Sequence, residues 1–153
     1  LSAAEQREGF QAALSGALDD SFNMEVVQAV HEQLLDKIEQ HKESKDPEPL
    51  TVSVQEVAAI LKDCGVADNQ VAAFEAQCGE QFGDGAVLNP ENIIDSKHFE
   101  VKTSDASVAI DPKRSYIVET RIIDGRKYLL IPADEGVEVN GMAVGIAAAD
   151  RRE

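Results

Sequence analysis

The residues best suited to chemistry in this chain are Asp95 and the Glu-Val-Lys segment that begins at Glu100. Metal-dependent nucleases use an acidic residue and a Glu-x-Lys on adjacent strands, where the carboxylates hold a divalent ion and the lysine positions a water. Alternation along a strand puts Glu100 and Lys102 on one face. Asp95 is too near in sequence to reach this pair easily from a separate strand. A divalent-metal-dependent hydrolase or nuclease-like site is therefore the alternative hypothesis, and a surface charge pair is the preferred interpretation.

The other common catalytic motifs are missing from the sequence. It contains no glycine-rich phosphate loop, no His-Glu-x-x-His and no Gly-x-Ser-x-Gly. We interpret His31 and His41 as surface or boundary residues, because no second ligand lies at a metal-binding spacing. The sequence therefore predicts no metal and no cofactor, and it favours a non-catalytic domain over an enzyme.

The acidic charge lies mainly in the first two thirds of the chain. Residues 1–95 carry 5 Lys and Arg against 19 Asp and Glu, while residues 96–153 carry 9 against 10. Helices predicted at residues 53–64 and 68–82 resemble a helix-turn-helix, but the second contains two glutamates and no lysine or arginine. Phosphate binding requires clustered basic residues. We therefore expect neither nucleic acid nor an anionic membrane as a partner.

The two cysteines, Cys64 and Cys78, are too few for a disulfide framework. We predict that each lies on the apolar side of a helix, where a free cysteine behaves as a small hydrophobe. A bridge between them requires that the two helices pack antiparallel. No apolar run is long enough to cross a membrane. A reduced, cytoplasmic location is the expectation.

Two short turns organise the last third of the chain. Asp124-Gly125 and Asn140-Gly141 each separate two apolar-rich runs and supply the positive φ angles of a type I′ hairpin turn. The first turn predicts the pairs Ile123 with Arg126, Arg121 with Tyr128, Thr120 with Leu129, and Val118 with Ile131. With the strands expected near residues 99–103 and 107–110, these hairpins predict an antiparallel sheet of about six strands.

Side chains of the first hairpin alternate between two faces. One face is predicted to lie against the core and carries Val118, Thr120, Ile122, Leu129 and Ile131. The other face is mixed, and a helix of the same chain or a partner could cover it. Its candidate interaction residues are Ile117, Arg121, Ile123, Tyr128 and Leu130.

Helix signals dominate the part of the chain before this sheet. Ser2 with Glu5, and Ser53 with Glu56, have capping-box spacing, and Asp68 is expected to cap a further helix. The apolar stripe of the helix that precedes residue 42 consists of Val26, Val27, Val30, Leu34, Leu35 and Ile38. These patterns define an α+β fold, with N-terminal helices followed by an antiparallel sheet built from hairpins.

A polar connector with two prolines, residues 42–49, is the best candidate for a boundary. We predict an N-terminal helical segment at 1–45, a domain of a helical hairpin and an antiparallel sheet at 50–144, and a disordered tail at 145–153. The first residue is leucine rather than methionine, from which we expect a fragment of a longer protein.

Several separate blocks of the chain resemble one family. They are His41-Lys-Glu-Ser-Lys-Asp-Pro-Glu-Pro-Leu50, Leu88-Asn-Pro-Glu-Asn-Ile93, Phe99-Glu-Val-Lys-Thr103, Val118-Glu-Thr-Arg121, Ile123-Asp-Gly-Arg-Lys-Tyr128 and Ile131-Pro-Ala-Asp-Glu-Gly-Val-Glu-Val-Asn-Gly141. Over roughly residues 19–144 the chain is similar to the C-terminal part of domain-of-unknown-function family 4317, found mostly in Firmicutes. The resemblance implies a longer bacterial cytoplasmic protein and supplies no activity or functional residues.

The function favoured by the sequence is protein interaction or scaffolding, through an unknown protein partner or self-association. The acidic helices, the mixed sheet face and the lack of a convincing active site all favour it over the hydrolase alternative.

Overall fold

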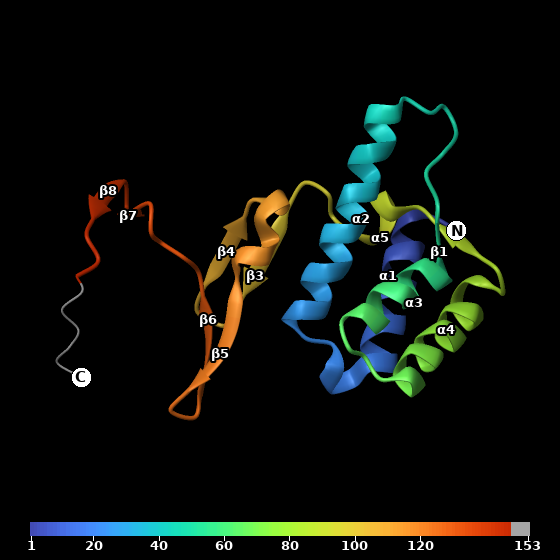
Figure 1. Cartoon of the computed structure of the whole chain (residues 1–153), viewed down its shortest axis with the longest axis horizontal. Helices are drawn as coiled ribbons and strands as arrows, with labels where there is room; N and C mark the ends of the chain where they lie inside the picture. The colour runs from blue at the N-terminus through green and yellow to red at the C-terminus, as the bar shows by residue number, and fades with distance from the viewer. Residues whose placement is uncertain (148–153) are drawn as a thin grey trace. The chain divides into compact units, whose positions relative to one another are not determined.

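The computed structural model describes residues 1–147 and has the α+β architecture that the sequence predicts. Helices come first and antiparallel hairpins follow (Figure 1). The helices are α1 (Ala3–Leu18), η1 (Asp19–Ser21), α2 (Met24–Ser44), α3 (Val54–Asp63), α4 (Asp68–Phe82), α5 (Pro90–Ile93) and η2 (Pro112–Ile117). The strands are β1 (Val52–Ser53), β2 (Val87–Leu88), β3 (Phe99–Lys102), β4 (Ser107–Ile110), β5 (Glu119–Ile123), β6 (Arg126–Leu130), β7 (Val137–Val139) and β8 (Met142–Val144).

The predicted capping boxes begin α1 and α3. The Ser2 hydroxyl accepts from the Glu5 backbone N–H at 3.1 Å, and the Ser2 N–H donates to the Glu5 carboxylate at 2.8 Å. Ser53 and Glu56 repeat this exchange at 3.1 and 2.7 Å. Each box satisfies backbone donors that a helix start leaves unpaired. The predicted cap of α4 is wrong: Ala67 occupies the N-cap, Asp68 is the first helical residue, and no side-chain hydrogen bond caps the helix.

One apolar core holds α1 to α5 together, in the region where Figure 1 shows these helices packed. The Phe10 and Phe74 rings form a T-shaped pair, with centroids 6.1 Å apart and planes at 85°. Most of the predicted α2 stripe is buried, whereas Val27 is 37% exposed. The largest fully buried apolar side chains of the core include Phe10, Leu18, Leu34, Val52, Leu61, Phe74 and Leu88.

The expectation of one sheet of about six strands needs correction. The described residues contain eight strands, arranged as four separate two-stranded antiparallel sheets. The helices consequently pack on one another, since no broad sheet is present among residues 1–147 for them to cover. β1, which precedes α3, pairs with β2, which follows α4, and Val52 lies opposite Leu88.

The predicted hairpin register is confirmed between Glu119 and Leu130. Ile123 pairs with Arg126, and the next predicted pairs also hold. Asp124 and Gly125 have φ angles of 51° and 79°, which suit a type I′ turn. The predicted pair of Val118 with Ile131 lies beyond the paired strands. The same turn chemistry recurs at Asn140-Gly141, between β7 and β8.

The prediction of which β5–β6 face lies against the core is wrong for most of its residues. Val118 is buried, but Ile122 is 73% exposed and Ile131 is 42% exposed. Every residue of β5 is exposed, and so are the first three residues of β6. Leu129 and Leu130, one on each face, are half-buried, and no local pattern indicated that β5 is exposed along its whole length.

Two compact units divide the chain, Leu1–Tyr116 and Ile117–Glu153. The core cluster of the first unit contains residues from both sides of the connector at 42–49. The segments expected at 1–45 and 50–144 stay a prediction of the sequence. The tail expected at 145–153 falls mostly on residues 148–153, which lie outside the described residues.

Candidate functional site

The structure brings together two of the three residues of the hydrolase alternative. The Lys102 ammonium lies 3.8 Å from Glu100 Oε1, and the Ser107 hydroxyl donates to Glu100 Oε2 at 2.8 Å. Asp95 has other partners: its Oδ1 accepts from the backbone N–H groups of Lys97 and His98 at 2.9 and 3.0 Å. Partial burial raises the Asp95 pKa, but these hydrogen bonds and the His98 imidazole together outweigh it, so the net shift of the pKa is downward.

The geometry agrees with a surface ion pair on β3. The side chains of Asp95, Glu100 and Lys102 are all exposed. Within residues 1–147, no group of three or more His, Cys, Asp or Glu residues is placed to hold a metal ion. An exposed pair of this kind contributes at most about 1 kcal/mol to stability. The hydrolase alternative at Asp95, Glu100 and Lys102 stays a prediction of the sequence.

His31 is a residue whose role the sequence analysis missed. It is 5% exposed, not a surface residue, and its Nε2 lies 3.2 Å from the Pro112 carbonyl oxygen. Its ring meets the Phe99 ring edge-on, with centroids 5.0 Å apart. Burial lowers the His31 pKa, while the Pro112 hydrogen bond and the charges of Asp95 and Glu32 oppose that shift. Helical spacing makes His31 a neighbour of Val30 and Leu34, which are buried. This spacing was the signal in the sequence that His31 is buried too.

We expect stability to depend on pH through His31. Its pKa is lowered from 6.5 on folding, so the unfolded chain binds more protons at mildly acidic pH. The stability linked to His31 should therefore be fully present above pH 6.5. It should be lost as the pH falls from 6.5 toward the folded pKa. Urea titrations between pH 5 and 8 measure this slope. His31→Gln keeps a hydrogen-bond donor without titrating, and it should flatten the slope; an unchanged slope would contradict the assignment.

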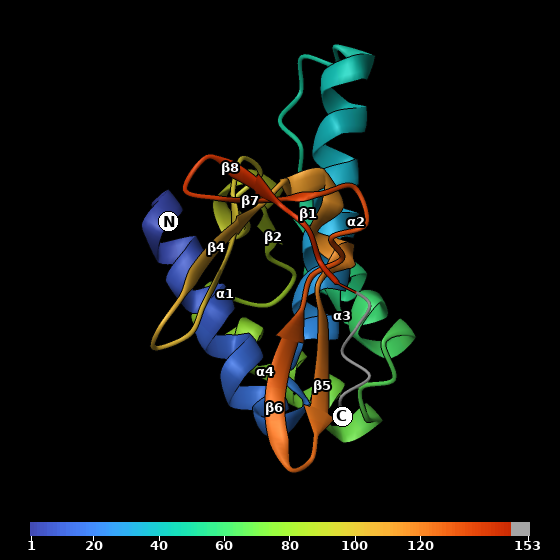
Figure 2. The ribbon, with the colours of Figure 1, turned by 90° about the vertical axis from the view of Figure 1, so that its left-hand side faces the viewer.

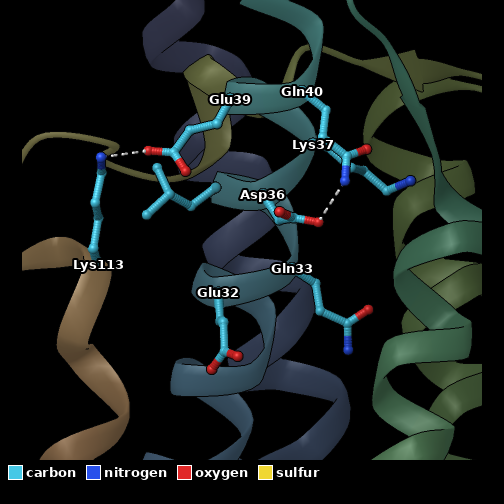
Figure 3. A pocket seen from close by; sticks show the side chains of 8 residues that line it. Glu32, Gln33, Asp36, Lys37, Glu39, Gln40 and Lys113 are labelled. Atoms are coloured by element: carbon cyan, nitrogen blue, oxygen red, sulfur yellow. Dashed lines mark hydrogen bonds and ion pairs between the residues drawn. The ribbon is translucent and has the colours of Figure 1, made fainter. Parts of the chain in front are cut away.

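Side chains of α2 also hold the segment that follows β4. Gln28 Nε2 donates to the Ser115 carbonyl at 2.8 Å, and Lys113 Nζ lies 3.3 Å from Glu39. Figure 3 shows Lys113 reaching Glu39 across a shallow surface pocket. The lining of this pocket is polar apart from Leu35: Glu32, Gln33, Asp36, Lys37, Glu39, Gln40 and Lys113. Most of its charged side chains already have partners: Lys113 pairs with Glu39, Lys37 pairs with Glu56, and Asp36 accepts a hydrogen bond from Gln40.

The more distinctive surface is the β5–β6 hairpin, seen in Figure 2 as a two-stranded ribbon joined by a tight turn. Of the candidate interaction residues, Ile123 and Tyr128 are 43% and 42% exposed, and Arg121 is exposed beside them. Ile117 and Leu130 are half-buried. We call Arg121, Ile123 and Tyr128 the hairpin surface.

Further exposed apolar residues lie outside the set that the sequence analysis selected. Ile122 is on the opposite face of β5, and Val139, Met142 and Val144 belong to the β7–β8 hairpin. All four are at least 42% exposed. For the three residues of the β7–β8 hairpin, the signal in the sequence was a pair of three-residue strands with apolar residues at alternate positions.

The fold and these surfaces define a helical α+β protein with exposed two-stranded hairpins. The chain belongs to a family described as a domain of unknown function (DUF4317), whose model matches residues 1–142. No curated protein and no solved structure matches the chain. Among residues 1–147, no helix has both the length and the apolar character needed to cross a membrane.

Proposed function

We propose that this chain is a non-catalytic protein-interaction module of a cytoplasmic protein, and that the hairpin surface is its contact site. The observation that carries the proposal is the exposure of Ile123 and Tyr128 on a paired, regular hairpin. Aromatic residues and arginine are the side chains most enriched at binding hot spots. The free thiols of Cys64 and Cys78 support a reducing compartment.

Energetics of a small sheet support the same proposal. A two-stranded hairpin is marginally stable in water, and it gains stability when a third strand or another element covers its apolar face. The apolar side chains of β5 and β6 lie on both faces, and Ile122, Ile123 and Tyr128 are all exposed. Contact with a partner would remove this apolar surface from water, at roughly 25 cal/mol per Å² buried.

Tyr128→Glu should abolish partner binding while leaving the fold intact. Binding would bury the new carboxylate against apolar groups of the partner. The cost of removing that charge from water would oppose binding. The matched control is Tyr116→Glu, since Tyr116 is the other tyrosine of the chain and is 54% exposed outside the hairpin. Affinity capture from host lysate with wild type and both variants measures retention, and circular dichroism checks folding. We expect loss for Tyr128→Glu alone.

Equal retention by all three proteins would contradict the assignment of the hairpin surface. If wild type and both variants retain nothing at stoichiometric level, the interaction function itself is overturned.

A further inference from the structure

The outer edge of β5 has no strand partner within residues 1–147. β5 pairs only with β6 there, and the closing pair of the two-residue turn is Ile123 with Arg126. In a hairpin of this type the closing pair exchanges hydrogen bonds, and inward and outward residues then alternate. Glu119, Arg121 and Ile123 thus direct their backbone groups at β6. Thr120 and Ile122 direct theirs away from it, toward the open edge.

The sequence of this edge is complementary to itself when it is reversed. The complementary residues within β5 are Glu119, Thr120 and Arg121. If two copies pair antiparallel about Thr120, the two Thr120 residues face each other and exchange backbone hydrogen bonds through their outward groups. Glu119 of each copy then faces Arg121 of the other, at a non-hydrogen-bonded position where opposed side chains are closest.

Charge selects this register over its neighbours. Moving the centre by one residue places either Arg121 opposite Arg121 or Glu119 opposite Glu119, and directly opposed like charges destabilise a sheet. β6 lacks this complementarity. In the antiparallel registers centred on Lys127, Tyr128 or Leu129, Lys127 faces itself or an apolar residue.

We infer that the outer β5 edge binds a second copy of the chain, joined in the register centred on Thr120. This inference goes beyond the proposed function, because Tyr128 lies on β6, outside the β5–β5 contact. The product is a four-stranded antiparallel sheet with the order β6–β5–β5–β6 and a two-fold axis through the Thr120 pair. Four strands pass the size at which a sheet becomes independently stable. The Glu119–Arg121 pair, now 3.2 Å apart within one strand, exchanges partners across the axis.

Charge reversal tests the register in the whole chain. Glu119→Arg and Arg121→Glu should each weaken self-association at least tenfold, because each places like charges opposite each other twice. An equimolar mixture of the two variants should form a heterodimer, since every opposed pair is again of opposite sign. The double variant E119R/R121E should dimerise like wild type. Sedimentation equilibrium measures the dissociation constants, and Glu135→Arg, the same charge change on an exposed residue outside the hairpins, should have no effect.

A backbone variant tests the edge independently of charge. Thr120→Pro removes an outward N–H that does not pair with β6, so the hairpin should persist while dimerisation is lost. Circular dichroism and melting temperature check that each variant folds. If a single charge variant is unfolded, the double variant and Thr120→Pro still decide the question.

Three results would overturn the inference: a wild-type chain that is monomeric at several hundred micromolar, a dimer indifferent to both single charge reversals, or a mixture that does not associate. A monomeric wild type that still retains another protein through Tyr128 would overturn only the second-copy inference and leave the interaction function standing. Retention of nothing, together with a monomeric chain, would overturn both.

Discussion

Phe74→Ala should lower the free energy of unfolding by about 3–5 kcal/mol, which is the usual range for removing a buried aromatic side chain. Phe74 is fully buried on α4 and meets the Phe10 ring of α1 edge-on. Its loss removes apolar contacts between two helices and leaves a cavity that neighbouring side chains fill only in part. Urea unfolding monitored by circular dichroism measures the change.

Val27→Ala is the matched control for core truncation, because Val27 lies on α2 yet is 37% exposed. We expect a loss well below about 1 kcal/mol at such a surface position. A small effect of Phe74→Ala, comparable with that of Val27→Ala, would contradict the placement of Phe74 at the centre of the core.

The second large effect concerns thiol reactivity, which should differ between the two cysteines by at least a hundredfold. Cys78 is fully buried, and burial raises its pKa to about 11, with the Glu75 charge adding to the shift. At pH 8 only about one thiol in a thousand would then be the reactive thiolate. Cys64 is exposed at the C-terminal end of α3, although partial burial also raises its pKa.

Labelling with a thiol reagent should therefore modify Cys64 quickly and Cys78 only as the core opens. Mass spectrometry of timed samples identifies the labelled residue, and Cys64→Ser isolates the slow reaction. The rate at Cys78 should rise steeply with urea. Equal labelling of both residues in native buffer would contradict the burial of Cys78.

These cysteines also show where sequence patterns stop being informative. Helical spacing correctly placed Cys78 in the core. The same rule wrongly placed Cys64 on an apolar side, because that residue caps the end of α3, where the chain leaves the helix. Periodicity holds only while the regular backbone continues.

Short-range signals were the reliable part of the sequence analysis. Capping boxes and the Asp124-Gly125 turn depend on residues a few positions apart, and all of them form as predicted. Whether hairpins join into one sheet depends on contacts distant in sequence, and no local pattern of residues 99–144 reports those contacts. The single predicted sheet failed for that reason.

The candidate site residues show the same difference between local contacts and contacts distant in sequence. Glu100 and Lys102 share a strand, so alternation was enough to place their ion pair. The hydrogen-bond partner of His31 is the carbonyl oxygen of Pro112, which lies 81 positions away. Only the folded chain brings that carbonyl oxygen to the imidazole.

The short ladder between β1 and β2 affects how this protein folds. It joins residues 52–53 to residues 87–88, and the chain between them forms α3 and α4. The ladder thus closes a loop whose interior is already two helices packed against each other, and that preformed structure reduces the entropy lost on closure. We therefore expect residues 52–88 to fold early as one cooperative unit, through contacts close in sequence, and then to offer a surface on which α1 and α2 pack.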